Sequence, residues 1–348
     1  MAEKPILPYS IDDLFASTGV GSLDKAIGNN LYGINHRQTP TPVPSNKDTY
    51  GLTFFVRPQL NLQTDNIRNV RLFYQLLSGV PTSLPHLVRC YLDPRMMEGY
   101  KTGSISVPPL NNPLVDNQSA FFPFLTNNLN SLSGWPDNTL PVWSSKPGLF
   151  KEVFTMPDGL VRNFGSYTLD ASFRNVVGDP TILLFHIWTN YMSLVKKGDL
   201  VPYLDYVTTN TMDWCSRIYR LTLDQQKNTV TKIFATGYCY PISVPTGSFA
   251  DFNKETPYND QNKDISIRFQ CHGFEALDDI LVYEFNATTQ IFNPSMKDDR
   301  REYDMHKLTK LELPFFNNRG YPRIEPTTYE LEWWVPIDLF NNRVTFDK

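Results

Sequence analysis

The sequence has few cysteines, no long apolar run and no excess of basic residues. Four cysteines in 348 residues, with no CxxC pair and no metal-ligand spacing, argue against a disulfide scaffold or a zinc finger. The nearest approach to a membrane span, residues 181–195, is interrupted by polar residues, so we expect no membrane segment. The 32 basic residues are outnumbered by 36 acidic ones, which disfavours a protein that holds nucleic acid by neutralising phosphates.

The cysteines are predicted to be buried, reduced thiols. Three of the four lie in strand-like sequence, and unpaired cysteine is among the most buried residue types. The start, Met-Ala-Glu-Lys-Pro, lacks the apolar stretch of a secretory signal, so we expect the chain to stay in a cytoplasm, where thiols are kept reduced. The four residues are Cys90, Cys215, Cys239 and Cys271.

The sequence contains no catalytic motif. It has no GxxxxGK, GxSxG or HExxH pattern, and Gly19-Val-Gly21 lacks the third glycine of a dinucleotide loop. Adjacent acids at 12–13, 278–279 and 298–299 are expected on solvated loops, whereas a glycosidase needs two separated carboxylates. His186 has no second ligand or base spaced near it and is expected to be structural. We predict that the chain is not an enzyme and has no cofactor or metal site.

Alternation of apolar and polar residues predicts a body of antiparallel strands. Residues 168–174 and 264–271 each place apolar side chains on one face and polar side chains on the other. Residues 215–223 and 229–235 are predicted to form a hairpin, and 280–285 a short buried strand. The polar residues of these two segments include Asp170, Ser172 and Arg174 in the first and Asp264, Ser266 and Arg268 in the second.

One long helix is predicted from residue 180 to residue 197. Asp179 is a suitable N-cap, Pro180 suits the first helical position, and Gly198 is a natural stop. Its apolar residues recur at spacings of three and four, so the helix is expected to cover a sheet. A shorter helix is predicted within 66–77.

The remaining segments are predicted to be arms and loops. Residues 1–49 are rich in proline, and 93–150 is loop-like with two aromatic clusters, at 121–124 and at Trp135 with Trp143. For these clusters two interpretations stay open, local packing under a loop or burial against another subunit. The charged run 297–302 is expected to be solvated surface.

Two groups of segments resemble bacteriophage tail tube proteins. The group similar to that family's central strand and helix comprises Tyr167–Arg174, the Gly178-Asp-Pro step, Phe185, Trp188-Thr-Asn-Tyr191 and Lys197-Gly198. The group similar to its closing strands comprises Tyr219–Leu223, Val230–Phe234, Gly237, Tyr240–Ser243 and Ile265–Phe269. By the same resemblance 52–62 is the opening strand and 120–125 its expected partner.

The resemblance implies a mainly β fold, an antiparallel β-sandwich or barrel of tail-tube type with one covering α-helix, to which this chain adds extended N- and C-terminal arms. We expect an N-terminal arm at 1–49, a β domain at 50–286 with an insertion at about 78–118, and a C-terminal extension at 287–348; the arm, the insertion and the extension depart from the family's pattern. The domain is expected to form hexameric rings that stack into a conduit for genome delivery, in the virion tail, after assembly in the host bacterial cytoplasm.

Partners implied by the resemblance are further copies of the chain, a contractile tail sheath, and baseplate or neck proteins, with DNA passing through and not bound. The six polar residues are candidates for facing the lumen or a subunit. The arms are expected to bury Phe315, Phe316, Trp333 and Trp334 against neighbouring copies. Alternatives are a tube-like baseplate or neck component, or a β-sandwich module that binds a receptor or carbohydrate.

Overall fold

The computed structural model describes residues 48–95, 100–102, 105–107, 112, 114–159, 165–316 and 319–346. The chain divides into two compact units. Unit 1 contains the residues up to Thr53 with Arg220–Phe234 and Ala276–Lys348, and unit 2 contains Phe54–Tyr219 with Ala235–Glu275.

The largest sheet has six strands in the order β1-β8-β9-β10-β7-β4. Strand β7 pairs antiparallel with both β10 and β4. Its strands are β1 (Thr53–Phe55), β4 (Leu129–Ser133), β7 (Ser166–Arg174), β8 (Ile218–Leu223), β9 (Val230–Ser243) and β10 (Asp264–Ala276). The predicted hairpin is confirmed, because β8 and β9 are joined by a turn in which the Asp224 carboxylate accepts the Asn228 N–H at 2.7 Å.

Strands β7 and β10 pair over nine residues, from Asp264 opposite Arg174 to His272 opposite Ser166. Residues directly opposite in an antiparallel pair share a face, so the two alternating patterns coincide. The face that they bury carries Leu169, Ala171, Phe173, Ile265, Ile267 and Phe269, all at most 1% exposed.

Helix α6 (Pro180–Lys197) covers this apolar face. The Phe185 ring lies 5.8 Å from Phe173 and 5.6 Å from Phe269, centroid to centroid. Gly198 ends the helix in a left-handed conformation, as predicted. Asp179 occupies the N-cap position, as predicted, but with φ of 51° it makes no side-chain cap bond, and its carboxylate accepts from the Asn175 amide at 2.6 Å.

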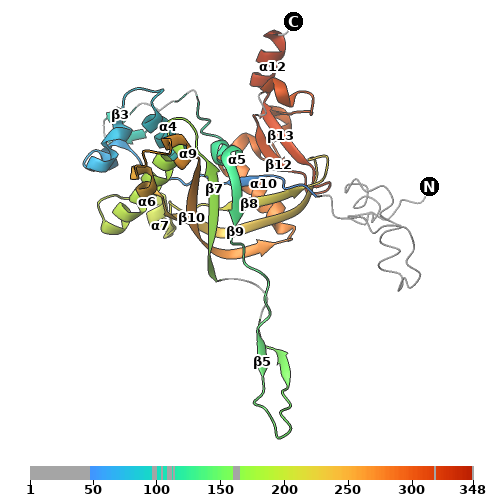
Figure 1. Cartoon of the computed structure of the whole chain (residues 1–348). Coiled ribbons are helices and arrows are strands. Elements are labelled where there is room, and N and C mark those ends of the chain that lie inside the picture. Colours follow the sequence, from blue (N-terminus) through green and yellow to red (C-terminus); the bar gives the residue numbers. More distant parts are fainter. Residues whose placement is uncertain are drawn as a thin grey trace, which may run out of the picture. The chain divides into compact units, whose positions relative to one another are not determined.

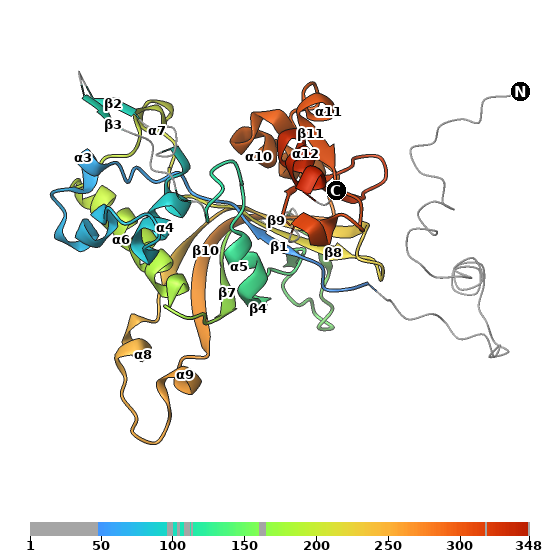
Figure 2. The ribbon, with the colours of Figure 1, turned by 90° about the horizontal axis from the view of Figure 1, so that it is seen from above.

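Around this layer unit 2 builds a large core with several short helices. Helix α4 (Leu84–Leu92) packs beside α6 in both views (Figures 1 and 2). A buried Arg57 connects the surrounding loops, donating to the carbonyl oxygens of Tyr91, Asp116 and Cys90 at 2.8–2.9 Å. The other short elements are α3 (Thr64–Ile67), η1 (Arg71–Leu77), α5 (Pro123–Asn128), α7 (Leu204–Thr209), α8 (Thr246–Ala250) and α9 (Tyr258–Gln261).

Two further two-stranded pairs occur in unit 2. Strands β2 (Tyr100–Thr102) and β3 (Ile105–Val107) form one, and β5 (Val142–Ser144) and β6 (Thr155–Pro157) form the other. Figure 1 shows the β5–β6 pair as a ribbon distinct from the six-stranded sheet.

The C-terminal residues of unit 1 form a folded module. Strands β11 (Met305–Lys307), β12 (Tyr321–Ile324) and β13 (Leu331–Pro336) make a sheet in the order β11-β13-β12. Residues 329–331 pair with the β8–β9 turn, since Val230 N–H donates to Tyr329 and Leu331 N–H to Asn228, each at 2.8 Å. The module's helices are α10 (Ile280–Phe292), η3 (Pro294–Met296), α11 (Arg301–Asp304), η4 (Leu313–Phe316) and α12 (Ile337–Phe346).

The fold class is therefore mixed α/β, and the prediction of a mainly β chain with one covering helix is wrong in this respect. The predicted strand at 280–285 is the start of α10, because a mostly apolar segment of six residues does not distinguish strand from helix. The segment 93–150, predicted as loop, contains α5 and β4. The predicted C-terminal arm is the folded module, whereas 1–49 falls outside the described residues except for Asp48 and Thr49.

The opening strand and its predicted partner do pair, although over a short length. Val56 bridges Phe121, Phe122 N–H donates to Phe55 at 3.0 Å and Arg57 N–H to Ala120 at 2.9 Å. The strand is shorter than 52–62 because Pro58 interrupts the pairing. Helix α10 runs across residue 286, and the division into arm, domain and extension stays a prediction.

We predict that Gly51→Ala destabilises the protein by about 2 kcal/mol or more. Gly51 has φ of 63°, and a Cβ there would lie 2.1 Å from the Leu221 carbonyl oxygen. Thermal and urea unfolding measure the effect. The control is Gly79→Ala, where a Cβ meets nothing within 4 Å; equal losses in the two variants would contradict the prediction.

Candidate subunit-contact surfaces

The six polar residues singled out in the sequence lie together on one face of β7 and β10. Their register is Asp264 opposite Arg174, Ser266 opposite Ser172 and Arg268 opposite Asp170. None belongs to the hydrophobic core. We call this surface the polar sheet face. Strand β4 extends it, because Ser131 pairs with Ser172 and Ser133 with Asp170.

One ion pair lies on the polar sheet face. The Arg268 guanidinium donates to the Asp170 carboxylate at 2.7 Å, and this bond raises the pKa of Arg268. Asp264 accepts from the Asn130 amide of β4 at 2.6 Å. Two aspartates and two arginines thus stand among hydroxyl side chains, and the face carries no excess of either sign.

The four candidate interface aromatics have different surroundings. Phe316 is 3% exposed and packs with Leu308 and Val335, and Trp334 is 9% exposed and packs with Met296 and Met305. Trp333 is half-buried beside the first of these clusters. Phe315 is 64% exposed. Phe316 and Trp334 therefore stabilise their own module, and among the four Phe315 has the most apolar area left for a neighbouring copy.

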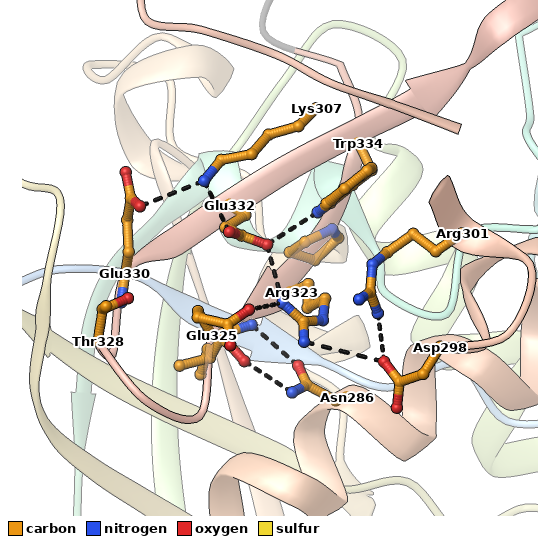
Figure 3. A network of polar contacts seen from close by, with 12 residues as sticks. Asn286, Asp298, Arg301, Lys307, Arg323, Glu325, Thr328, Glu330, Glu332 and Trp334 are labelled. Atoms are coloured by element: carbon orange, nitrogen blue, oxygen red, sulfur yellow. Dashed lines mark hydrogen bonds and ion pairs between the residues drawn. The ribbon is translucent and has the colours of Figure 1, made fainter. Parts of the chain in front are cut away.

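A polar network crosses the C-terminal module (Figure 3). Glu332, 6% exposed, accepts from Lys307 at 2.7 Å, from Arg323 at 2.9 Å and from the Trp334 indole at 3.0 Å. Burial by itself raises the pKa of Glu332, but these three donors outweigh it and hold the pKa below its usual range. The carboxylate is therefore ionised and fully bonded within the module.

The charged run 297–302 joins this network at two residues, since Asp298 also pairs with Arg323 at 3.8 Å. Arg301 is 8% exposed, its guanidinium lies 5.1 Å from the Trp334 ring centroid, and it pairs with Asp298. Residues 297–300 and 302 are exposed, as predicted. The expectation of solvated surface is thus wrong for Arg301, because a guanidinium can stack on an aromatic ring while keeping a carboxylate partner.

A second buried acid lies in unit 2. Asp213 is 1% exposed, accepts from the Tyr191 hydroxyl, and has one carboxylate oxygen, Oδ1, with no hydrogen-bond partner among the described residues. Burial raises the pKa of Asp213 to about 6, against the lowering effect of the Tyr191 bond. The Tyr191 hydroxyl also accepts the Asn61 N–H at 3.1 Å. Another buried carboxylate of unit 2, Asp93, accepts from the Tyr203 hydroxyl at 2.8 Å.

The cysteines are all free, and three of the four are buried, as predicted; Cys215 is half-buried. Burial raises the pKa of Cys90 to about 11 and of Cys215 to about 12, and raises that of Cys239 as well. At neutral pH these thiols stay protonated, which is the unreactive form.

No cluster of three or more potential metal ligands occurs among the described residues. Within the same residues, no helix has the length and apolar character needed to cross a membrane. His186 is half-buried and contacts Asn190 of its own helix at 3.3 Å, which is consistent with a structural histidine.

One exposed apolar surface, that of the β5–β6 pair, was not predicted from the sequence. Of the aromatic clusters with two open interpretations, Phe121 and Phe122 are buried in the body, and Trp135 packs on Phe274 with ring centroids 5.5 Å apart. Trp143, however, is 47% exposed in the β5–β6 pair, where apolar residues recur around prolines and a glycine. The prolines in and around this segment made it resemble an irregular loop in the sequence.

The six-stranded sheet thus has one apolar face and one polar face, and the polar face carries the Arg268–Asp170 ion pair. Comparison with family profiles supplies the family: residues 8–347 match the one described as "Putative phage tail tube protein". The match covers nearly the whole chain, and the chain belongs to this family. Membership agrees with the prediction that it is a structural protein of the virion and not an enzyme.

A comparison with curated proteins gives no match. Two solved structures are similar over part of the chain. The sheath/tube terminator of an extracellular contractile injection system, PVC, in its extended state has 12% identity and a TM-score of 0.25, over 45% of this chain and 87% of that one. The tube-terminating cap of the anti-feeding prophage has 14% identity and a TM-score of 0.28, over 45% and 81%. Neither similarity carries an inference about this chain.

We predict that Asp213 makes stability fall as pH rises. Its pKa is raised above the unfolded value of about 4, so the folded state binds the proton more tightly, and stability declines between about pH 4 and pH 6. The decline attributable to this group is about 3 kcal/mol at most. Melting temperatures of wild type and Asp213→Asn across this range measure it; identical pH profiles would contradict the prediction.

We predict that Glu332→Ala destabilises the C-terminal module by about 3 kcal/mol, because it leaves the buried Arg323 guanidinium and the Trp334 indole without their shared acceptor. Glu330→Ala is the matched control, since Glu330 also contacts Lys307, at 3.3 Å, but from an exposed position. It is expected to cost less than about 1 kcal/mol. Urea unfolding followed by tryptophan fluorescence compares them, and equal midpoints would show that the network is not stabilising.

Proposed function

We propose that the chain forms closed rings, expected to be hexameric, that stack into a phage tail tube with the polar sheet face toward the lumen. The observation that carries this is the register of β7 and β10, which places six polar side chains on one face and the core on the other. In the tube, this face lines the conduit.

The edge of the six-stranded sheet gives the ring a means of closure. Strand β4 is last in the strand order, and Asn130, Ser131 and Ser133 are exposed. An exposed edge strand promotes pairing with another chain, and a closed ring removes the edge. At the other end of the sheet the segment 55–57 is already paired with 120–122, which favours a contact between unlike edges.

The charge pattern suits a conduit that releases its contents. Binding to DNA depends on cations that neutralise phosphates. On the polar sheet face Arg268 is paired with Asp170, and Arg174 stands opposite Asp264 in the register. DNA therefore passes this surface without being held, in keeping with the net charge of −4.

The direct test is size-exclusion chromatography with negative-stain electron microscopy of the purified full chain. Rings that stack into tubes support the proposal. Rings that never stack would favour a baseplate or neck component, and compact monomers at all concentrations would favour a binding module; either result would overturn the tube.

We predict that Ser266→Cys reacts with a maleimide on a large polymer in the monomer but is protected in tubes, because the polymer cannot enter the lumen. A small maleimide should label it in both states. Ser248→Cys, on the exposed α8 segment, is the control and should react with the polymer in both. Equal polymer reactivity of the Ser266→Cys variant in monomers and tubes would place the polar sheet face outside the lumen.

A further inference from the structure

Two of the buried cysteines lie on neighbouring strands of the six-stranded sheet. Cys239 is in β9 and Cys271 is in β10, and these strands are adjacent in the sheet order. Both side chains are 0% exposed and belong to the core of unit 2. The proposed tube gives neither thiol a role, so we asked what their placement allows.

The register of β9 and β10 sets the two cysteines directly opposite each other. The Tyr238 ring stacks on the His272 ring, with centroids 4.7 Å apart and an interplanar angle of 17°. One residue further back on β9, Gly237 lies against Gly273, since a Cβ on Gly273 would be 3.7 Å from the Gly237 Cα. A step back along β9 is thus matched by a step forward along β10, as in an antiparallel pair. The residues that follow Tyr238 and precede His272 are the two cysteines.

The cysteines occupy a non-hydrogen-bonded position of this strand pair. The Cys239 N–H donates to the Ser216 carbonyl, and the Cys239 carbonyl accepts the Ser216 N–H, each at 2.8 Å. Both backbone groups of Cys239 therefore point toward Ser216 and away from β10. Opposite residues at such a position have Cα atoms about 4.5 Å apart, within the range of roughly 4.4–6.8 Å that disulfides have.

The two thiols also meet. Opposite residues of a sheet project from the same face, and the Cys239 and Cys271 side chains share a hydrogen bond. Burial is the main cause that raises the pKa of Cys239, and the bond with Cys271 raises it further. The pair is therefore in contact in the reduced form, and the Cys239 thiol stays protonated at neutral pH.

The strands approach closely beside the cysteines. A Cβ at Gly237 would lie only 2.7 Å from the His272 carbonyl oxygen. A disulfide needs its Cβ atoms about 3.8 Å apart, closer than the roughly 4.5–5.5 Å of an ordinary opposite pair. Gly237 and Gly273, which have no side chains, permit this approach at the next position on the same face. Gly237 is also exposed, so the cysteine pair lies near the border of the core.

A protein of the virion meets two redox environments. It is made in a cytoplasm, which keeps thiols reduced, and the released virion is exposed to an oxidising medium in which disulfides persist. The other two cysteines take no part in this strand pair, because Cys90 lies in α4 and Cys215 precedes β8. They serve below as internal controls.

We propose that Cys239 and Cys271 form a cross-strand disulfide when the folded protein leaves the reducing cytoplasm, with a small peroxide as the oxidant. The thiolate of one residue attacks a peroxide oxygen, which gives a sulfenic acid and releases hydroxide. The proton lost by that thiol converts the hydroxide to water. The second thiol then attacks the sulfenic sulfur, and the sulfur–sulfur bond forms as another water leaves. Two thiols and one hydrogen peroxide thus give one disulfide and two waters.

The bond would hold the base of a long connection. The chain between the two cysteines contains α8 and α9, and Figure 2 shows this segment extending away from the strands. Bridging its ends closes a loop of about 30 residues, which removes conformational freedom from the unfolded chain. The disulfide therefore stabilises the sheet without adding any contact to the folded state.

The direct test uses the wild-type full chain, purified with a reductant. After the reductant is removed, the folded protein is incubated with hydrogen peroxide, and free thiols are blocked with iodoacetamide before digestion without reduction. Mass spectrometry is expected to find the Cys239 peptide linked to the Cys271 peptide. The yield should rise over hours, because a protonated thiol reacts slowly. Dithiothreitol should separate the two peptides again.

Melting temperatures connect the bond with stability. Oxidation is expected to raise the melting temperature of the wild type by about 5 °C, because the bridged chain has less entropy to gain on unfolding. Cys239→Ala and Cys271→Ala should show no such rise. Cys90→Ala and Cys215→Ala leave the pair intact and should show the full rise. Each variant is compared with itself before and after oxidation, so a loss of stability from the substitution cancels.

Five results would overturn the proposal. They are a link from Cys239 to Cys215, links only between separate chains, sulfinic acid in place of a link, thiols that stay free, and a link that forms only after unfolding and refolding in peroxide. The last would show that the folded strands do not admit the bond. Because the disulfide lies within one chain, its formation does not depend on whether the chain builds rings, and the two proposals can fail separately.

Discussion

The in-register pairing of β7 with β10 is the constraint on which the rest of unit 2 depends. Two strands of period two coincide over nine residues, so one face is wholly apolar and α6 covers it, while the other remains polar. A slip of β10 by one residue against β7 would bury Arg268 and expose Phe269, because the slipped strand turns its side chains to the other face. The strong difference between the faces holds the register, and the register creates the polar sheet face.

Long periodic segments could be predicted from the sequence, whereas short ones could not. Strands β7 and β10 and helix α6 follow from their spacing, because each repeats its pattern over at least two full periods. The run 280–285 was too short to distinguish strand from helix. The helix is marked by buried residues that recur at spacings of three and four along α10: Leu281, Val282, Phe285, Asn286 and Thr289. Asp179 is a residue type that favours the N-cap position, but its carboxylate accepts a hydrogen bond from the Asn175 amide and makes no cap bond.

The candidate surfaces were predicted to a similar extent. The six polar residues could be chosen from alternation alone, but their pairing across two strands is a tertiary fact that no single segment contains. Trp334 and Phe316 were expected to be buried against neighbouring copies, whereas in the structure they pack on residues of their own module, which tertiary folding brings together. The β5–β6 pair was missed because prolines hide its two short strands.

In the proposed tube, the ion pair between Arg268 and Asp170 would determine how the lumen wall responds to the salt concentration. A repeated ring of such couples has little net charge, so its potential falls off within a few ångströms and there is little long-range field for salt to screen. Transit of a polyanion along such a wall would be governed by friction and water structure, and its rate would change little between dilute and concentrated electrolyte.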